Sequence, residues 1–225
     1  AYHQALEVEP ANVAALVGLG RIYQIDAKSA QALAQYQAAV AAAPTSSDGW
    51  MALGREYRRT GAREQAITVF ERAIAADPTS PLAYLELSNI HLASGDWEQA
   101  QSLCRQASEA NASDPAGLLC LGNLEELQGE WREALAWYSA AADAAPASPQ
   151  TYLAQGQVRR RQGDWPGAKM AFQWAIAARP TSVEAYADLA DLYQAQGRFA
   201  QAIGQAEAAV KANPGSSTAY LALGD

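Results

Sequence analysis

Three ionisable residues, His91, Glu125 and Arg159, follow one another at intervals of 34 residues along the chain. Tyrosine occupies the same offset elsewhere, for example at Tyr57 and Tyr193. One buried charge is costly, whereas two opposite charges that pair and form hydrogen bonds are tolerated. We therefore expect an ion pair between Glu125 and Arg159, with His91 as a third member of this polar network. The alternative is that Arg159 extends to solvent and the three side chains do not meet.

The sequence contains no constellation of residues that is typical of an enzyme. It has no nucleophile beside a base, no carboxylates paired in a fixed motif and no glycine-rich phosphate loop. Cys104 and Cys120 are too few for a metal site or a disulfide framework. We expect two partly buried thiols here, with a bridge between them as the alternative. The chain is thus predicted to be non-catalytic, with no cofactor and no metal.

Composition and charge narrow the classes of partner. The formal net charge is -8 and the sequence pI is about 4.8, with the acidic residues spread along the chain. Nucleic-acid binding needs a basic surface, so nucleic acid is not an expected partner. No apolar run approaches the roughly 18 residues of a membrane span. The chain opens at Ala1 with residues typical of a helix interior, so we expect an excised fragment, whose compartment is unknown.

A period of 34 residues extends through the whole sequence. Self-similarity at this period is typical of a solenoid built from stacked supersecondary units, each of which contacts mainly its neighbours. Such a molecule offers a long concave surface to a partner rather than a closed pocket for chemistry. The blocks begin at Val13, Ser47, Pro81, Pro115, Pro149, Val183 and Ser217.

The second block illustrates the local pattern of all of them. Trp50, Leu53 and Tyr57 form an apolar stripe at helical spacing, and Gly61 supplies a turn. A second helix follows, with Phe70 flanked by alanines, before a proline ends it. Each block is therefore predicted to be a hairpin of two helices. The aromatic residues that share an offset after the turn are expected in the core, namely Trp97, Trp131, Trp165 and Phe199.

This order of a large residue, Leu-Gly, Tyr, Gly, Ala, Phe, Ala and Pro at fixed offsets resembles the tetratricopeptide repeat. The resemblance implies an all-α fold, a right-handed α-solenoid of antiparallel helix hairpins. Residues 1–12 resemble the second helix of a truncated repeat, and residues 217–225 the start of a further truncated repeat. Six complete repeats are expected at 13–46, 47–80, 81–114, 115–148, 149–182 and 183–216.

The resemblance also places certain positions of each first helix, including the fifth, ninth and thirteenth, on the concave face. Arginines there bind carboxylates, amides pair with a peptide backbone, and leucines contact apolar side chains. The predicted partner is a protein or peptide segment of acidic and apolar character, with its acidic part over the early repeats. The alternative is that these are ordinary solvated positions of a scaffold. The expected peptide-binding residues are Arg21, Met51, Arg55, Arg59, Leu85, Asn89, Leu119, Asn123 and Gln157.

A non-catalytic protein-interaction scaffold is therefore the leading hypothesis for function. One alternative is a substrate-presenting arm of a larger glycosyltransferase or envelope-polysaccharide assembly protein, as in related repeat arrays. Another is self-association, in which copies stack head to tail through complementary half-hairpins at the two ends. The terminal-carboxylate clamp of chaperone-binding family members is not expected, because Met51, Glu86 and Ala116 stand at three of its positions.

Overall fold

Helices alternate with short loops along the chain. The computed structural model describes the backbone of residues 1–224 and the side chains of residues 1–220. The last residues of the expected repeat at 217–225 therefore lie outside the described residues. The helices are α1 (Tyr2–Val8), α2 (Val13–Ile25), α3 (Ser29–Ala42), α4 (Ser47–Arg59), α5 (Arg63–Ala76), α6 (Pro81–Leu92), α7 (Trp97–Ala110), α8 (Ala116–Gln128), α9 (Trp131–Ala144), α10 (Pro149–Arg161), α11 (Trp165–Ala178), α12 (Val183–Ala195), α13 (Phe199–Ala212) and α14 (Ser217–Gly224).

The turn inside each hairpin depends on one backbone conformation. Gly61 has a φ of +78°, a region that glycine enters without steric cost. The residue at the same offset in the first hairpin is Ala27, which adopts a φ of 58° despite its Cβ atom.

The helices that follow the turns begin in different ways. Asp96, for example, caps α7 by accepting a hydrogen bond from the backbone N–H of Gln99 at 3.2 Å.

The two helices of a hairpin meet where a small residue of the first helix faces a larger one of the second. A Cβ atom added at Gly54 would lie 2.5 Å from the ring of Phe70. In the third hairpin the two residues are Ser88 and Cys104, whose Oγ and Sγ atoms are 3.1 Å apart. Close approach therefore depends on matched sizes. The other glycine–aromatic pairs are Gly20–Tyr36, Gly122–Tyr138 and Gly156–Phe172.

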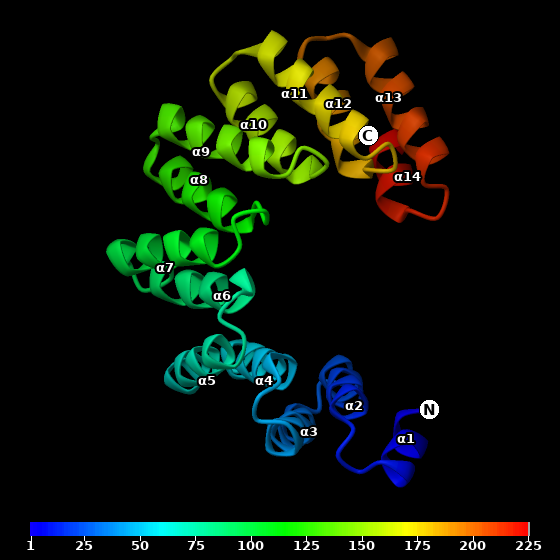
Figure 1. Cartoon of the computed structure of the whole chain (residues 1–225). Coiled ribbons are helices and arrows are strands. Elements are labelled where there is room, and N and C mark those ends of the chain that lie inside the picture. Colours follow the sequence, from blue (N-terminus) through cyan, green and yellow to red (C-terminus); the bar gives the residue numbers. More distant parts are fainter. Residues whose placement is uncertain (225) are drawn as a thin grey trace. The chain divides into compact units, whose positions relative to one another are not determined.

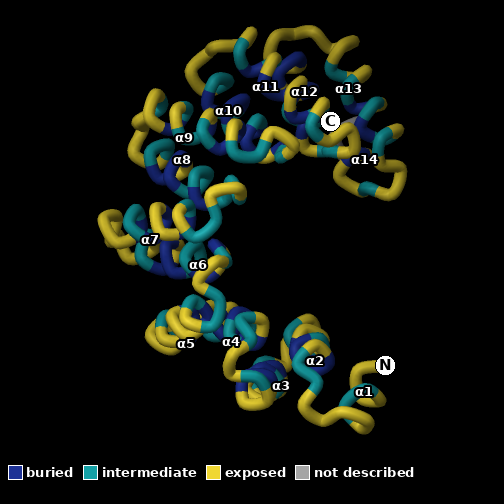
Figure 2. The backbone as a smooth tube through the Cα atoms, viewed as in Figure 1, coloured by how far each residue is buried: buried dark blue, intermediate teal, exposed yellow. Residues whose placement is uncertain are grey.

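The chain divides into two units, residues 1–111 with α1–α7 and residues 112–225 with α8–α14. Within each unit, consecutive hairpins pack side by side (Figure 1). Buried residues line the interior of the hairpins, whereas the loops between helices are exposed (Figure 2). The part of the chain with assigned structure contains helices only, which confirms the all-α solenoid. None of these helices is long and apolar enough to cross a bilayer.

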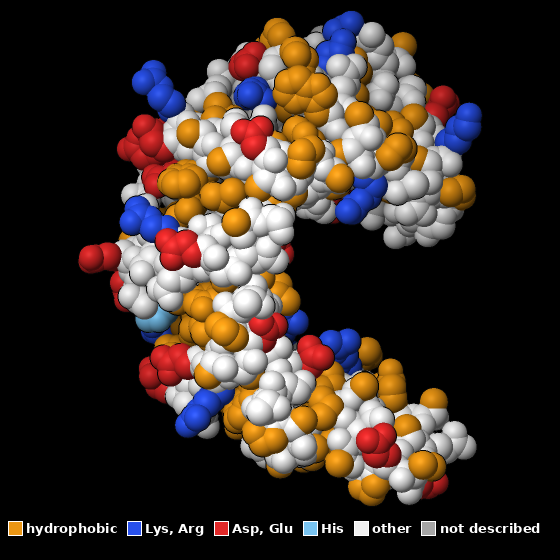
Figure 3. All heavy atoms as spheres, in the orientation of Figure 1, with side chains coloured by type: hydrophobic (Ala, Val, Ile, Leu, Met, Phe, Trp, Pro, Cys, Tyr) orange, Lys and Arg blue, Asp and Glu red, His pale blue; other side chains and the backbone are white. Residues whose placement is uncertain are grey.

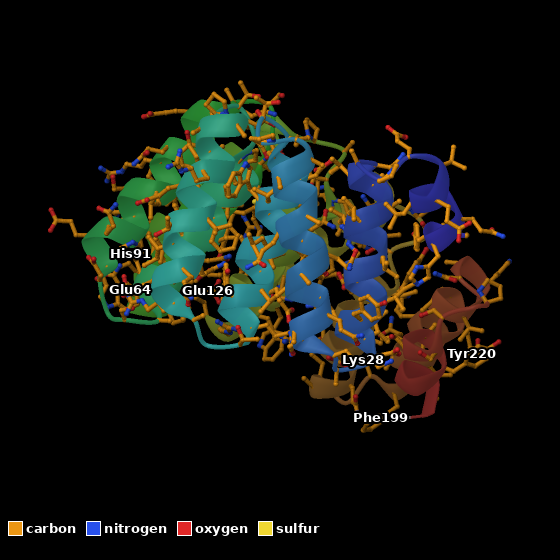
Figure 4. All side chains as sticks on the ribbon, turned by 90° about the horizontal axis from the view of Figure 1, so that it is seen from below. Lys28, Glu64, His91, Glu126, Phe199 and Tyr220 are labelled. Atoms are coloured by element: carbon orange, nitrogen blue, oxygen red, sulfur yellow. The ribbon has the colours of Figure 1, made fainter. Side chains whose placement is uncertain are left out.

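Two expectations about buried residues are wrong. Trp97, Trp165 and Phe199 are 39%, 38% and 63% exposed, whereas Trp131, at the same offset, is half-buried and packs against the core. Figure 4 shows Phe199 pointing away from the ribbon. Neither Cys104 nor Cys120 is a free thiol, and both are disulfide-bonded. The shared offset of these aromatic residues did not indicate how far each is exposed, and the positions of the cysteines did not indicate their oxidation state.

Candidate peptide-binding surface

A groove of about 860 Å³ lies on the first unit, over the first helices α2 and α4. Three of the residues expected from the sequence, Arg21, Met51 and Arg55, line it together. They come together because the fifth and ninth residues of a first helix lie one turn apart on the same face. The apolar part of the lining includes Val17 and Leu82, and Leu82 is half exposed. Hydrophobic side chains also lie on the surface of the first unit in the view of Figure 3.

Arg55 already has a partner in this groove. Its Nε atom donates to Oε1 of Glu86 on α6 at 2.7 Å, and Nε of Arg58 lies 3.2 Å from the other carboxylate oxygen. The Glu86 side chain is only 12% exposed. One carboxylate thus serves two guanidinium groups, which leaves one excess positive charge. Arg21 makes no ion pair or hydrogen bond through its side chain within the described residues, so its guanidinium is open to a ligand.

Arg59 is also engaged, with the carboxylate of Glu56, which was not among the expected site residues. Its guanidinium binds Glu56 in a bidentate manner, with Nε 2.9 Å from Oε2, and also reaches Oγ of Ser29 at 2.5 Å. Glu56 is fully buried. Burial, and then the Glu56 carboxylate, raises the pKa of the neighbouring Tyr36. The sequence indicated this buried carboxylate, because a glutamate stands at an offset that is aliphatic in the other repeats. The residues there are Ile22, Ile90, Leu124, Val158 and Leu192.

Two more of the expected residues lie on α6. Leu85 is half-buried, and Asn89 is exposed. Asn89 does not line the groove over α2 and α4. It lines a smaller cavity of about 280 Å³ beside Arg58.

In the second unit, Asn123 takes part in a polar cluster within the hairpin of α8 and α9. The hydroxyl of Tyr138 lies 2.7 Å from Oδ1 of Asn123 and 2.8 Å from Oε2 of Glu126. A hydroxyl has one proton, so it can donate to only one of them at a time. Arg161 pairs with the same Glu126. Burial, together with the hydrogen bond to Glu126, raises the pKa of Tyr138. Leu119 packs beside this tyrosine.

Gln157, the last of the expected binding residues, contacts the next repeat. Its Nε2 atom donates to Oδ2 of Asp188 at 3.1 Å, and Arg160 lies 4.0 Å from the same carboxylate. This repeats the contact between Arg55 and Glu86, and both hydrogen bonds join residues that are 31 positions apart. A donor at the ninth position of one first helix thus reaches an acid at the sixth position of the next. The side-chain amide of Gln157 therefore already has a hydrogen-bond partner in the next repeat.

The structure gives two members of the expected polar network other partners. Nη1 of Arg159 donates to Oε1 of Gln155 at 3.0 Å, one turn back on its own helix. Gln155 in turn donates to the backbone carbonyl of Tyr138 at 3.1 Å. Nδ1 of His91 lies 3.1 Å from Oδ2 of Asp96, within its own hairpin. Arg159 thus folds back along its own helix, and the expected ion pair between Glu125 and Arg159 stays a prediction.

Asp188 should make the stability of the second unit depend on pH. Burial raises its pKa, aided by Asp191 and Glu184, while Gln157 and Arg160 lower it. With a folded pKa above the unfolded value, the folded state binds more protons, and stability falls as pH rises through the folded pKa.

Asp188→Asn is therefore expected to reduce the loss of stability between pH 4 and pH 7. Urea denaturation at the two pH values measures it. The exposed Asp143, on α9, supplies the control variant Asp143→Asn, which should leave the pH dependence as it is in the natural sequence. An unchanged pH dependence in Asp188→Asn would contradict this assignment.

Stacked hairpins with polar contacts from repeat to repeat define a helical-repeat solenoid. Two family models, both described as the tetratricopeptide repeat, match the sequence. The chain belongs to the tetratricopeptide repeat family, whose members are generally non-catalytic scaffolds for protein–protein interaction. One model matches residues 57–119, and the other matches residues 26–81, 153–216 and 187–225.

Three solved structures show the similarity of fold. The crystal structure of the APC/C hetero-tetramer Cut9-Hcn1 has a TM-score of 0.64 at 16% identity, covering 99% of this chain and 44% of that chain. TTC0263, a protein of Thermus thermophilus, has a TM-score of 0.60 at 23% identity, with 80% and 97% covered. YrrB, a protein of this family with an unusual peptide-binding site, has a TM-score of 0.50 at 18% identity, with 82% and 95% covered. A search of curated proteins found no match.

Proposed function

We propose that the first unit binds an acidic and apolar segment of a partner protein in the groove over α2 and α4. The observation that carries this proposal is the position of Arg21. Its guanidinium has no partner among the described residues, and it lines a groove of about 860 Å³ together with apolar side chains. A guanidinium binds a carboxylate through two parallel hydrogen bonds, which fixes orientation as well as adding affinity.

The rest of the lining gives the bound segment a direction. Val17 and Leu82 offer apolar contact area, while Asp48 and Asp77 also line the groove. Two aspartates repel a second carboxylate. The acidic residue of the ligand is therefore placed over Arg21, and its apolar residues lie toward the other side chains. Arg55 and Arg59 contribute less to this choice than the sequence suggested, because Glu86 and Glu56 already hold them.

The comparisons support binding of this general kind. The family is one of protein-interaction scaffolds, and YrrB is described as having a peptide-binding site. A solenoid provides such a surface without a closed pocket. The alternatives of a presenting arm and of head-to-tail self-association stay predictions.

A random-peptide library displayed on phage, selected against the whole chain, tests the proposal. We expect enriched peptides that combine a carboxylate with apolar residues. Arg21→Glu should weaken the binding of a selected peptide at least about tenfold, because an attractive charge becomes repulsive. Isothermal titration calorimetry measures the affinities.

Arg72→Glu provides the matched control, since Arg72 is exposed on α5 and does not line the groove. It carries the same change in charge and should bind the peptide as the natural sequence does. Equal losses in the two variants, or a selection without acidic and apolar peptides, would refute the proposed groove. Circular dichroism verifies that both variants fold.

A further inference from the structure

A second cavity of the first unit, of about 280 Å³, lies where α4, α5 and α6 come together near the hairpin turns. Arg58, Arg63, Asn89 and Ser94 are the residues with polar side chains among those that line it. The remaining lining residues are small or apolar, among them Gly61 and Ala93. Two arginines and an asparagine, from three different helices, therefore line one cavity.

The thirteenth position of the repeat carries a small residue beside this cavity. At this position α4 has Arg59, whose guanidinium reaches Ser29 at the beginning of the preceding second helix. The equivalent residue of α10, Arg161, reaches back to Glu126. The chain of α6 continues into Ala93, whose methyl group cannot extend to the start of α5. Ala93 therefore lines this cavity at the position that carries an arginine in α4 and α10.

The charges around the cavity are unbalanced. Arg63 is exposed and makes no ion pair or hydrogen bond through its side chain within the described residues. Arg58 uses its Nε atom on Glu86, and Arg55 shares that carboxylate, so the terminal nitrogens of Arg58 remain available. The nearest acid in sequence, Glu64, lines a separate cavity on α5.

Asp96, in the neighbouring hairpin, also has a partner. His91 pairs with Asp96 within its own hairpin. Figure 4 labels His91 and the Glu64 of the neighbouring helix α5. No carboxylate lines the cavity itself. An anion that enters it would therefore meet uncompensated positive charge.

We infer that this cavity binds a phosphomonoester, namely a phosphorylated serine or threonine in the segment that occupies the neighbouring groove. This rests on the proposed function, since Arg55 of the groove and Arg58 of the cavity hold the same Glu86. A phosphomonoester carries a charge of about -1.5 to -2 at pH 7 and three acceptor oxygens. Two guanidinium groups and an amide match that charge and number of acceptors, whereas a carboxylate has a single charge and a planar shape.

The test uses the whole chain and a probe that is too small to fill the groove. N-acetyl-phosphoserine amide is titrated into isotope-labelled protein, with N-acetyl-serine amide, inorganic phosphate and sodium chloride at matched ionic strength as comparisons. We expect saturable shifts of the amide signals of Arg63, Asn89 and Ser94 with phosphoserine, and none with the serine probe or with chloride. Saturation by inorganic phosphate alone would show a site for the free ion and would overturn the inference.

Arg63→Gln should weaken phosphoserine binding about tenfold, which is the size of one lost charge-assisted hydrogen bond. Arg72→Gln removes the same charge from the same helix, away from the cavity, and should leave the affinity unchanged. Equal weakening in the two variants would mean that general charge, rather than this cavity, attracts the probe, and would overturn the inference.

The two proposals can fail separately. Arg21→Glu should not change phosphoserine binding, and Arg63→Gln should not change the binding of an unphosphorylated peptide. If Arg21→Glu weakens the phosphoserine probe as strongly as Arg63→Gln does, the cavity is not a separate site. If phosphoserine binds while no peptide can be selected, the proposed groove fails, and the phosphate has another source.

Discussion

Replacing Arg59 with leucine should lower the stability of the first unit strongly, whereas replacing Glu56 with leucine should not. The two residues form one bidentate ion pair, but their surroundings differ. Glu56 is fully buried, while the Arg59 side chain is 41% exposed. A buried carboxylate that loses its partner costs about 3 to 5 kcal/mol, because no water replaces the lost hydrogen bonds.

The reverse change leaves no unpaired charge in the interior. Without Glu56, the guanidinium of Arg59 can turn to water. Leucine is also well suited to the vacated position, since the corresponding residues of the other repeats are aliphatic. Replacement of a buried ionic group by a hydrophobic one of similar volume is often neutral or stabilising. We expect Glu56→Leu to change the free energy of unfolding by less than about 1 kcal/mol, or to raise it.

Urea denaturation followed by circular dichroism compares these two variants with Arg72→Leu. The control removes an exposed arginine of α5 that makes no side-chain contact of this kind among the described residues. The midpoint should fall clearly for Arg59→Leu and stay close to the natural value for the other two. Equal losses in Arg59→Leu and Glu56→Leu would show that the pair is a net stabilising interaction, contrary to this account.

The hairpins were predictable because their signals are local and recur. The spacing of Trp50, Leu53 and Tyr57 indicates a helix, and Gly61 indicates the turn that follows it. The first helices α2, α4 and α6 begin at block starts, at Val13, Ser47 and Pro81. In α8 the helix begins one residue later, at Ala116, because Pro115 takes the position of the N-cap. The exposure of Trp97, Trp165 and Phe199 was not predictable from the period, which says that they are equivalent but not what covers them.

For the candidate site, too, the repeat pattern predicted some features and not others. The periodicity placed Arg21, Met51 and Arg55 on one surface, and they line one groove. It did not show which guanidinium groups were already paired, because that depends on residues of another repeat. Glu86 lies 31 residues beyond Arg55, and no reading of single offsets relates them. Contacts between repeats therefore determine which side chains of the groove can bind a ligand.

We expect the ring of Phe172 to require a residue without a side chain at position 156. A double-mutant cycle can measure the coupling free energy between the two positions. A Cβ atom at Gly156 would lie 2.3 Å from a ring atom of Phe172, which is fully buried. The ring would have to move within a close-packed interior, and overpacking of this kind costs about 1 to 3 kcal/mol. This exceeds or offsets the gain of up to about 1 kcal/mol in helix propensity that alanine brings.

The sixth hairpin indicates which change relieves the clash. It carries Ala190 and Ala206 at the two equivalent offsets, and both are buried. Phe172→Ala alone should cost about 3 to 5 kcal/mol, because it leaves a cavity. In the double variant Gly156→Ala with Phe172→Ala, the added methyl group no longer meets a ring and fills part of that cavity. The double variant should therefore lose less stability than the two single variants together.

Urea denaturation of the four proteins gives the coupling free energy, which we expect to be at least about 1 kcal/mol in favour of the double variant. Gly204→Ala with Phe172→Ala supplies a control cycle, since a Cβ atom at Gly204 meets no atom within 4 Å. That cycle should be additive within about 0.5 kcal/mol. Additivity in both cycles would mean that the ring of Phe172 can move aside without a measurable cost in free energy. The exclusion of side chains from Gly54 and its equivalents would then need a cause other than the close approach of the second helix.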